Sequence, residues 1–393
     1  MAETRDIINT GLRGVTVAST KISNVDGEAG KLIYRGYRIT DLAQNASFEE
    51  IVYLLLYEKL PREQELEDFA KRLNKERALP QGIIKALKTR PGDSRPMDIL
   101  QAVPPMLANH DPDAETLTEE KALDIGVKLI AKFPTAVAAW ENLRNGREPV
   151  DPDPELGHAE NFLYMLTGTR PDEEVARFMD ICLVLHADHT FNASTFAARE
   201  VCSTRAHMYS AVAAAVGSLS GELHGGANAR VMKTLLDIGS LEAVEGYVTD
   251  LLDKGGKIMG LGHAVYQTLD PRARILDPIS KRLGEKINDS RWYGLTKKLE
   301  EEGREAFKKR KGKDIYPNVD FFSASVYYCM GIPIDLFTPV FAISRVSGWA
   351  AHVIEEQYAA AAPKPVLYRP SAEYVGEYCG PEECAFVPMD RRE

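Results

Sequence analysis

The sequence predicts a mainly α-helical protein with one small β element. Three observations carry this prediction. Helical signals recur over most of the 393 residues, capping residues open the early helices, and strand-like alternation is confined to the first forty residues. With 44% hydrophobic and 27% charged residues, the composition is that of a globular protein with ample apolar material for a large core. The length predicts roughly two to three domain-sized units.

The β element is expected near the N-terminus. Apolar and polar positions alternate through Val15, Val17 and Ile22, a glycine-rich turn follows at residues 26–30, and apolar positions resume at residues 32–34. This pattern is typical of a small β-hairpin.

Two helices are expected next. Residues 47–50 (SFEE) form a capping box that opens an apolar helix. Pro61 is expected in the first turn of a second helix, whose apolar face is Leu66, Phe69 and Leu73.

Proline and glycine clusters then punctuate the helical pattern. We expect loops at Pro104-Pro105 and at residues 111–113, 147–154 and 255–256. None of these segments is long enough, or rich enough in Gly and Ser, to act as a flexible linker. The small residues of segment 208–221 predict a buried helix and make it a candidate for a subunit contact.

Composition also excludes some classes of function. The longest uncharged apolar runs, residues 208–221 and 321–334, have 14 residues each, which is too short to span a bilayer. The first residues show no secretory or targeting pattern, and the five irregularly spaced cysteines favour reduced thiols, so we expect a cytoplasmic protein. A net charge of −10 argues against a nucleic-acid surface covering the whole protein.

Three histidines are candidates for chemistry. His189 lies in a polar segment, and His224 and His263 stand beside glycines, where backbone can approach a ligand closely. The alternative for each one alone is a loop histidine satisfied by backbone. A metal site is disfavoured because there is no HExxH and no paired CxxC, and a nucleotide fingerprint is also missing.

Charged residues downstream are ambiguous on their own. The run 308–313 (KKRKGK) is either a solvated helix end or a docking patch for a phosphorylated cofactor. Asp320 alone is interpreted as a helix N-cap. Arginines bind carboxylates in bidentate fashion, but in a helix over residues 342–357 Arg345 points away from the apolar stripe, so spacing does not decide whether it faces solvent or a cleft.

Taken together, the motifs resemble those of the citrate synthase family, in the family's order and approximate spacing over nearly the whole chain. They are the N-terminal hairpin, LHADHTFNAS (185–194), GELHGGAN (221–228), GLGHAVY (260–266), DPRA (270–273), YPNVDF (316–321) and YRPSAEYVG (368–376). The resemblance implies a mostly helical homodimer with an active site in the cleft between two domains. It implies a large domain of residues 1–225 and 332–393 and a small inserted domain of residues 226–331.

The resemblance also implies a reaction: Claisen condensation of acetyl-CoA with oxaloacetate, followed by hydrolysis of citryl-CoA to citrate and CoA. Asp320 would take a proton from the thioester methyl group while His224 donates a hydrogen bond to the thioester oxygen. One such donor is typically worth about 3 to 4 kcal/mol. His263 would polarise and then protonate the oxaloacetate carbonyl.

The same resemblance assigns the binding residues. His189, Arg272 and Arg345, joined by Arg369 of the partner subunit, would hold the carboxylates. Lys311 and Lys313 would lie near the CoA phosphates. Acetyl-CoA is a co-substrate, and neither a metal nor a permanently bound cofactor is required.

Two positions depart from the family's pattern. Gln267 stands where a lysine or arginine is usual near the CoA phosphates, and Arg230 stands where an acidic residue is frequent. The extra N-terminal domain of the hexameric, NADH-inhibited branch is not seen, which favours a dimer without that control. Two alternatives stay open: a 2-methylcitrate synthase that uses propionyl-CoA, because one methylene changes binding by only about 1 to 3 kcal/mol, and a non-catalytic regulatory or binding paralogue.

Overall fold

A computed structural model describes residues 11–12, 14–374 and 386–392. It confirms the mainly α-helical class, since these residues form sixteen α-helices, two short 3-10 helices and a single three-stranded sheet. The strands are β1 (Ser23–Asp26), β2 (Lys31–Tyr34) and β3 (Tyr37–Arg38). The helices are α1 (Ile39–Asn45), α2 (Phe48–Tyr57), α3 (Glu63–Glu76), α4 (Gln81–Lys88), α5 (Pro96–Ala108), α6 (Glu119–Arg144), α7 (His158–Thr167), α8 (Glu173–His186), α9 (Ala193–Ser203), α10 (Met208–Leu219), α11 (Ala227–Ile238), α12 (Val244–Asp253), α13 (Pro271–Lys286), α14 (Arg291–Lys311), α15 (Val319–Cys329), η1 (Ile334–Leu336), α16 (Phe337–Tyr358) and η2 (Met389–Arg391).

The predicted hairpin is confirmed. Strands β1 and β2 pair antiparallel, with Ser23 opposite Tyr34. The alternation expected at Val15 and Val17 is wrong as a strand signal, because both side chains are exposed and precede the sheet. Strand β3 was not predicted, since two residues are too few to show a period.

Of the two early helices, one begins where the sequence predicts. Ser47 and Glu50 form the capping box of α2, in which the Ser47 backbone N–H donates to Glu50 Oε2 at 2.7 Å. The placement of Pro61 is wrong, because α3 begins at Glu63 with Arg62 as its N-cap. Pro61 therefore precedes the helix.

The loop expected at Pro104-Pro105 is also wrong, since both prolines lie inside α5. Proline removes a backbone donor from a helix. Burial of Val103, Pro104 and Leu107 and packing against α10 keep the helix continuous. The buried helix predicted at residues 208–221 is confirmed as α10, which packs on α9 and α5.

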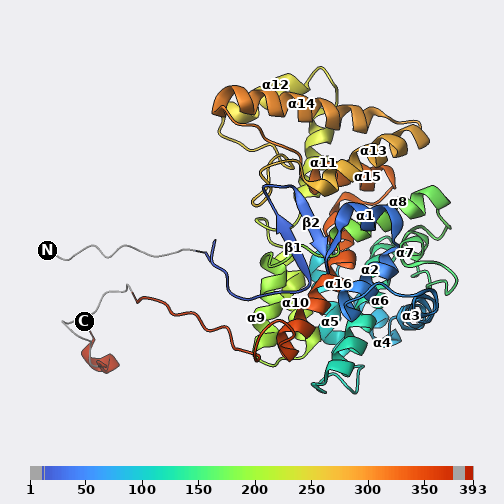
Figure 1. The fold of residues 1–393 in the computed structure, drawn as a ribbon, viewed down its shortest axis with the longest axis vertical. Coiled ribbons are helices and arrows are strands. Elements are labelled where there is room, and N and C mark those ends of the chain that lie inside the picture. The colour runs from blue at the N-terminus through green and yellow to red at the C-terminus, as the bar shows by residue number, and fades with distance from the viewer. Residues whose placement is uncertain (1–10, 13, 375–385, 393) are drawn as a thin grey trace.

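Helix α16 runs through the middle of the core. It packs against α6, α8, α9 and α10, and large side chains such as Trp349 are fully buried. Helices α11–α15 gather at one end of the molecule and α2–α7 at the other, with the β1–β2 hairpin between them (Figure 1). This arrangement places several loops in the middle of the molecule.

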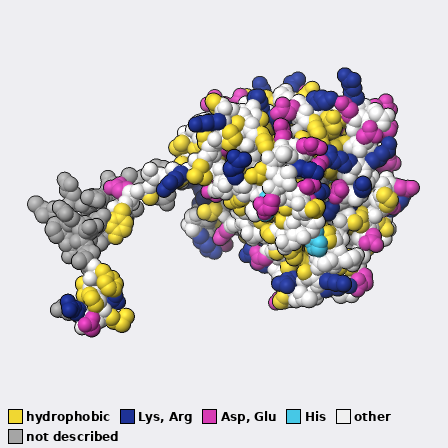
Figure 2. All heavy atoms as spheres, turned by 90° about the horizontal axis from the view of Figure 1, so that it is seen from below, with side chains coloured by type: hydrophobic (Ala, Val, Ile, Leu, Met, Phe, Trp, Pro, Cys, Tyr) yellow, Lys and Arg dark blue, Asp and Glu magenta, His cyan; other side chains and the backbone are white. Residues whose placement is uncertain are grey.

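The C-terminal arm, defined here as residues 361–374, projects from the body (Figures 1 and 2), although Tyr368 is held to it by a hydrogen bond from its hydroxyl to Glu356 at 3.0 Å. Its apolar side chains Val366, Leu367 and Tyr374 are exposed. In the described part of the chain, no helix is both long and apolar enough to cross a membrane.

Candidate active site

A cavity of 480 Å³ lies where the central loops meet. It brings together residues that are far apart in the sequence, from loops and helices between His189 and Arg345. Six of the predicted site residues line it: His189, His224, His263, Arg272, Asp320 and Arg345. The structure therefore places these six side chains around one cavity.

His224 lies in the turn between α10 and α11. Its Nε2 atom lies 2.8 Å from the hydroxyl oxygen of Ser194 and accepts a hydrogen bond from the Ser194 backbone N–H at 3.2 Å. Burial, and then the positive charge of Arg345, lower the pKa of His224 to about 4. The imidazole is therefore neutral near pH 7.

His263 lies on the segment 261–270, which we call the His263 loop. Its Nδ1 atom accepts hydrogen bonds from the backbone N–H groups of Val265 (2.9 Å) and Tyr266 (3.1 Å). Since Nδ1 is an acceptor, the proton of the neutral ring is on Nε2. Burial and the nearby Arg272 lower the pKa of His263 to about 4, so the ring presents a neutral N–H donor.

Asp320 is in the first turn of α15. The interpretation of Asp320 as an N-cap is wrong, because Asn318 caps the helix and its Oδ1 atom accepts the Asp320 backbone N–H at 3.0 Å. The Asp320 carboxylate is thus released from capping and lines the cavity. Burial raises its pKa to about 6, against the lowering effect of Arg272. A carboxylate with a raised pKa is a stronger base.

The segment before Asp320 is tied to the His263 loop. The side-chain amide of Asn318 donates to the carbonyl oxygen of Gly262 at 2.8 Å, and the Asn318 backbone N–H donates to the carbonyl oxygen of Gly260 at 2.9 Å. The carboxylate and His263 therefore sit on two segments with a fixed relation to each other.

Two buried arginines give the cavity positive charge. Arg345 of α16 is only 1% exposed, and its Nε atom donates to the carbonyl oxygen of His186 at 2.7 Å. Burial lowers the pKa of Arg345 to about 10. Arg272 of α13 is paired in bidentate fashion with Asp270, at 3.0 and 2.8 Å. Burial alone would lower the pKa of Arg272. The negative charge of Asp270 and its hydrogen bonds to the guanidinium outweigh burial, so the pKa of Arg272 is raised.

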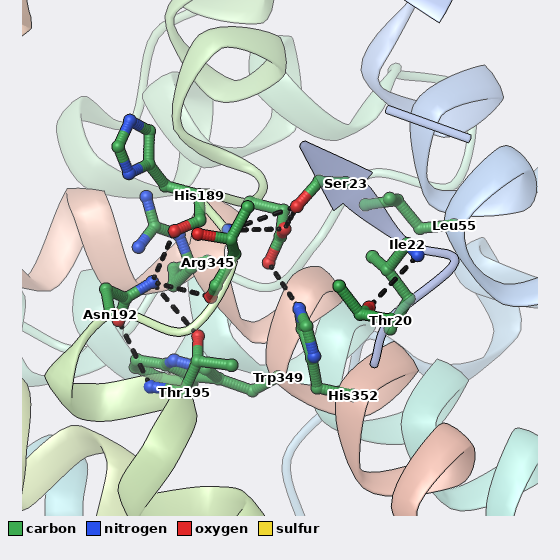
Figure 3. A network of polar contacts seen from close by, with 12 residues as sticks. Thr20, Ile22, Ser23, Leu55, His189, Asn192, Thr195, Arg345, Trp349 and His352 are labelled. Carbon is green, nitrogen blue, oxygen red and sulfur yellow. Dashed lines mark hydrogen bonds and ion pairs between the residues drawn. The ribbon is translucent and has the colours of Figure 1, made fainter. Parts of the chain in front are cut away.

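His189 lies on the segment 187–192, which we call the His189 loop. Its Nε2 atom is 3.3 Å from the hydroxyl oxygen of Tyr266. Burial, with Arg272 nearby, lowers the pKa of His189 well below its usual value. The side-chain amide of Asn192 donates to the carbonyl oxygen of His189 at 3.4 Å and to Thr195 Oγ1 at 3.0 Å (Figure 3).

The same loop carries a buried carboxylate, Asp188, to which the sequence reasoning gave no role. Asp188 accepts hydrogen bonds from the Ser23 hydroxyl and, at 3.0 Å, from the Thr190 backbone N–H. Its other oxygen is 3.3 Å from His352 Nε2. Ser23 and His352 approach the loop from two different elements (Figure 3). Burial opposes ionisation, yet His352 and Arg345 lower the pKa of Asp188.

The sequence offered a signal for only some of the missed residues. Ser194, Tyr266 and Asp270 lie inside the motifs that carry the resemblance, beside residues already singled out. Ser23 and His352 are remote from those motifs, and no spacing rule connects them to the site.

Several predicted site residues lie outside the cavity lining. Lys311 and Lys313 are exposed at the C-terminal end of α14, and Arg369 is exposed on the C-terminal arm. Gln267 is exposed, with its backbone N–H bonded to Gly27, and Arg230 donates to the carbonyl oxygen of Glu222 at 2.8 Å.

Other candidate groups give no site of their own. Within the described ranges, no group of three or more His, Cys, Asp or Glu side chains is arranged to hold a metal ion. Cys182, Cys202 and Cys329 are buried free thiols. Cys379 and Cys384 lie outside the described residues.

The arrangement suits two kinds of chemistry. A carboxylate of raised pKa next to neutral imidazole donors can take a proton while hydrogen bonds stabilise the oxyanion that forms. Two buried guanidinium groups and a histidine can hold a ligand with several carboxylates.

The comparisons with known proteins agree on one family. A family model described as "Citrate synthase, C-terminal domain" matches residues 11–371. The citrate synthase of Haloferax volcanii is 45% identical over 391 residues, which covers 98% of this chain and 99% of that protein. The 2-methylcitrate synthase of Shewanella oneidensis is 37% identical, covering 96% of this chain and 97% of that protein.

Solved structures give the same result. The citrate synthase of Pyrobaculum aerophilum has a TM-score of 0.88 and 41% identity, covering 97% of this chain and 95% of that one. The ternary complex of the Thermoplasma acidophilum citrate synthase with carboxymethyl coenzyme A and oxaloacetate has a TM-score of 0.89 and 34% identity. It covers 98% of this chain and 99% of that one.

Proposed function

Because this chain belongs to the citrate synthase family and is an acyltransferase of that type, we propose that His224, His263 and Asp320 catalyse its reaction. The reaction is condensation of acetyl-CoA with oxaloacetate, followed by hydrolysis to citrate and CoA. The single observation that carries this assignment is the convergence of the three side chains, from three distant segments, on one cavity.

The first step is removal of a proton from the thioester methyl group. Asp320 accepts this proton, since its carboxylate lines the cavity and its raised pKa makes it a stronger base than an ordinary aspartate. The Nδ1–H of neutral His224 donates to the thioester oxygen, where negative charge develops.

The second step joins the two substrates. The enolate carbon attacks the oxaloacetate carbonyl carbon, and the C=O electron pair moves to oxygen. His263 Nε2–H transfers its proton to that oxygen. Water then cleaves the thioester of the citryl-CoA product, releasing citrate and CoA.

Oxaloacetate is held through its carboxylates by His189, Arg272 and Arg345. Among the described residues, Arg345 donates a hydrogen bond from its Nε to the carbonyl oxygen of His186, which leaves its terminal nitrogens for a ligand. Arg272 is pre-oriented by Asp270, which leaves less side-chain entropy to lose on binding.

We also propose a homodimer in which Arg369 of the partner subunit completes the carboxylate site. Arg369 is not among the residues that line the cavity of its own chain, and the C-terminal arm exposes Val366 and Leu367. Exposed apolar side chains on an extended arm are typical of a segment that packs on another subunit.

The remaining assignments are proposals too. The large domain is residues 1–225 and 332–393, the small domain is residues 226–331, and the cavity lies in the cleft between them. Lys311 and Lys313 face the CoA phosphates, where exposed cations bind phosphate. A cytoplasmic location suits the three buried free thiols.

The acyl group is proposed to be acetyl rather than propionyl. Five citrate synthases are 40 to 45% identical to this chain, whereas three 2-methylcitrate synthases are 36 to 37% identical. The test is oxaloacetate-dependent release of CoA, with kcat/KM measured for both acyl-CoAs and the product identified. A higher kcat/KM for acetyl-CoA with citrate as product supports the proposal, a clear preference for propionyl-CoA contradicts it, and no CoA release favours a non-catalytic paralogue.

A further inference from the structure

The β1–β2 hairpin is anchored at its base to the His189 loop. The Ser23 hydroxyl donates to Asp188 and accepts the Thr190 backbone N–H at 3.0 Å. The Tyr34 hydroxyl donates to the carbonyl oxygen of Asp188 at 3.0 Å and accepts the Asp188 backbone N–H at 3.2 Å. Both strands of the hairpin therefore bond to the same loop, and the Ser23 end of this network is visible in Figure 3.

The tip of the same hairpin packs on the His263 loop. The Gln267 backbone N–H donates to the carbonyl oxygen of Gly27 at 2.9 Å. A Cβ atom on Gly27 would overlap the Val265 carbonyl group. A Cβ atom on Gly30 would lie 2.7 Å from Thr268 Cγ2. The backbone of the hairpin tip thus packs directly against the His263 loop, and neither residue 27 nor residue 30 has space for a side chain.

The loop residues touched by the tip include one that orients His263. The backbone N–H groups of Val265 and Tyr266 donate to His263 Nδ1 and so fix the ring and its proton on Nε2. The Tyr266 hydroxyl in turn faces His189 Nε2 at 3.3 Å. A displacement of Val265 therefore moves one of the donors that set the position of His263.

We propose that the hairpin tip is a clasp for the His263 loop, with Gly27 and Gly30 as positioning residues that act through Val265 and Thr268. The proposal rests on the role given above to His263. It assigns a function to the hairpin beyond packing, namely to hold the proton donor at its working place. In the proposed domain division the clasp joins the large domain to the small one, and the hairpin stands between the two ends of the molecule (Figure 1).

The test compares two tip variants with two matched controls. Gly27→Ala and Gly30→Ala push the tip away from the His263 loop. Glu28→Ala changes an exposed side chain of the same tip. Gly36→Ala is the control for Gly30→Ala, because both glycines have positive φ, +92° and +62°, but Gly36 has nothing within 4 Å of its Cβ position.

Two readouts are measured: steady-state kinetics, and amide hydrogen exchange of the peptide that contains the His263 loop. We expect both tip variants to lower kcat by about 10- to 100-fold, since misplacement by an ångström has costs of this order. The KM for oxaloacetate should change by less than about threefold, because the residues proposed to bind its carboxylates, His189, Arg272 and Arg345, are not substituted. The His263-loop amides exchange faster in the tip variants, and both controls behave as wild type.

Three results overturn the clasp. They are wild-type exchange and kcat in both tip variants, a loss of kcat with unchanged exchange of the His263 loop, and an equal loss of kcat in the controls. If one tip variant fails to fold, the other decides. Since hydrogen exchange needs no turnover, it tests the clasp even if the proposed reaction is wrong.

Discussion

The Nε2 atom of His224 accepts the backbone N–H of Ser194 at 3.2 Å. An amide N–H can only donate, so this nitrogen carries a lone pair and the ring proton is on Nδ1. A pKa of about 4 keeps the ring neutral near pH 7. One contact with the backbone thus determines which nitrogen of His224 carries the proton, and so which nitrogen would donate in the proposed mechanism.

The Ser194 hydroxyl should matter for orientation rather than for binding. It lies 2.8 Å from His224 Nε2 and also accepts the indole N–H of Trp349 at 3.2 Å. Ser194→Ala keeps the backbone N–H but loses these contacts, so we expect kcat to fall about tenfold, the effect of losing one net hydrogen bond. The KM for oxaloacetate should stay within about threefold of wild type.

The control is Ser347→Ala, which removes a buried hydroxyl that bonds within α16 to the carbonyl oxygen of Ser344. Its kcat should match that of wild type. Equal kcat for Ser194→Ala and wild type would show that the hydroxyl does not orient His224.

The pH dependence of kcat/KM should follow the ionisation of Asp320. The base must be ionised to accept a proton, and its pKa is raised to about 6. We therefore expect kcat/KM to rise as pH increases through about 6 and then to level off. His224 and His263, with pKa values of about 4, stay neutral across this range and add no step. A profile that is flat between pH 5 and 7, or that falls as pH rises through 6, would contradict the assignment.

The sequence predicted correctly those parts of the fold that depend on residues close together in the chain. The capping box at Ser47 and the turn of the β1–β2 hairpin depend on neighbouring residues, so the sequence predicted both. The loop at Pro104 failed because tertiary packing of α5 against α10 outweighs the helix-breaking tendency of proline. Asp320 was mistaken for an N-cap because Asn318, two residues earlier, is an equally good cap.

The relations between distant segments could not be predicted. For Arg345, spacing left open whether the side chain faces solvent or a cleft; in the structure it is buried, with its Nε atom bonded to the carbonyl oxygen of His186 at the end of α8. Likewise, no spacing connects Ser23 to Asp188 or Gly27 to Val265. These contacts depend on how the chain folds back over itself, which a period of two or 3.6 residues does not describe.

The role of Arg369 can be tested by mixing two inactive variants. If Arg369 of the partner subunit completes each site, Arg369→Ala and Asp320→Asn should each be inactive alone. Co-refolded mixtures then regain about a quarter of wild-type activity, since half of the dimers are mixed and each has one intact site. Mixtures that regain nothing would place Arg369 in its own subunit's site, and an active Arg369→Ala would place it outside the mechanism.

The most direct test of the catalytic assignment is the turnover of Asp320→Asn beside its affinity for oxaloacetate. Asparagine keeps the shape but does not accept the methyl proton, so kcat should fall by about 10²- to 10⁴-fold. The Kd for oxaloacetate, measured by calorimetry, should stay within about threefold, because His189, Arg272 and Arg345 are unchanged. Asp314→Asn, at an exposed acid near the end of α14, should behave as wild type. Full activity in Asp320→Asn would remove Asp320 from the mechanism and contradict the account.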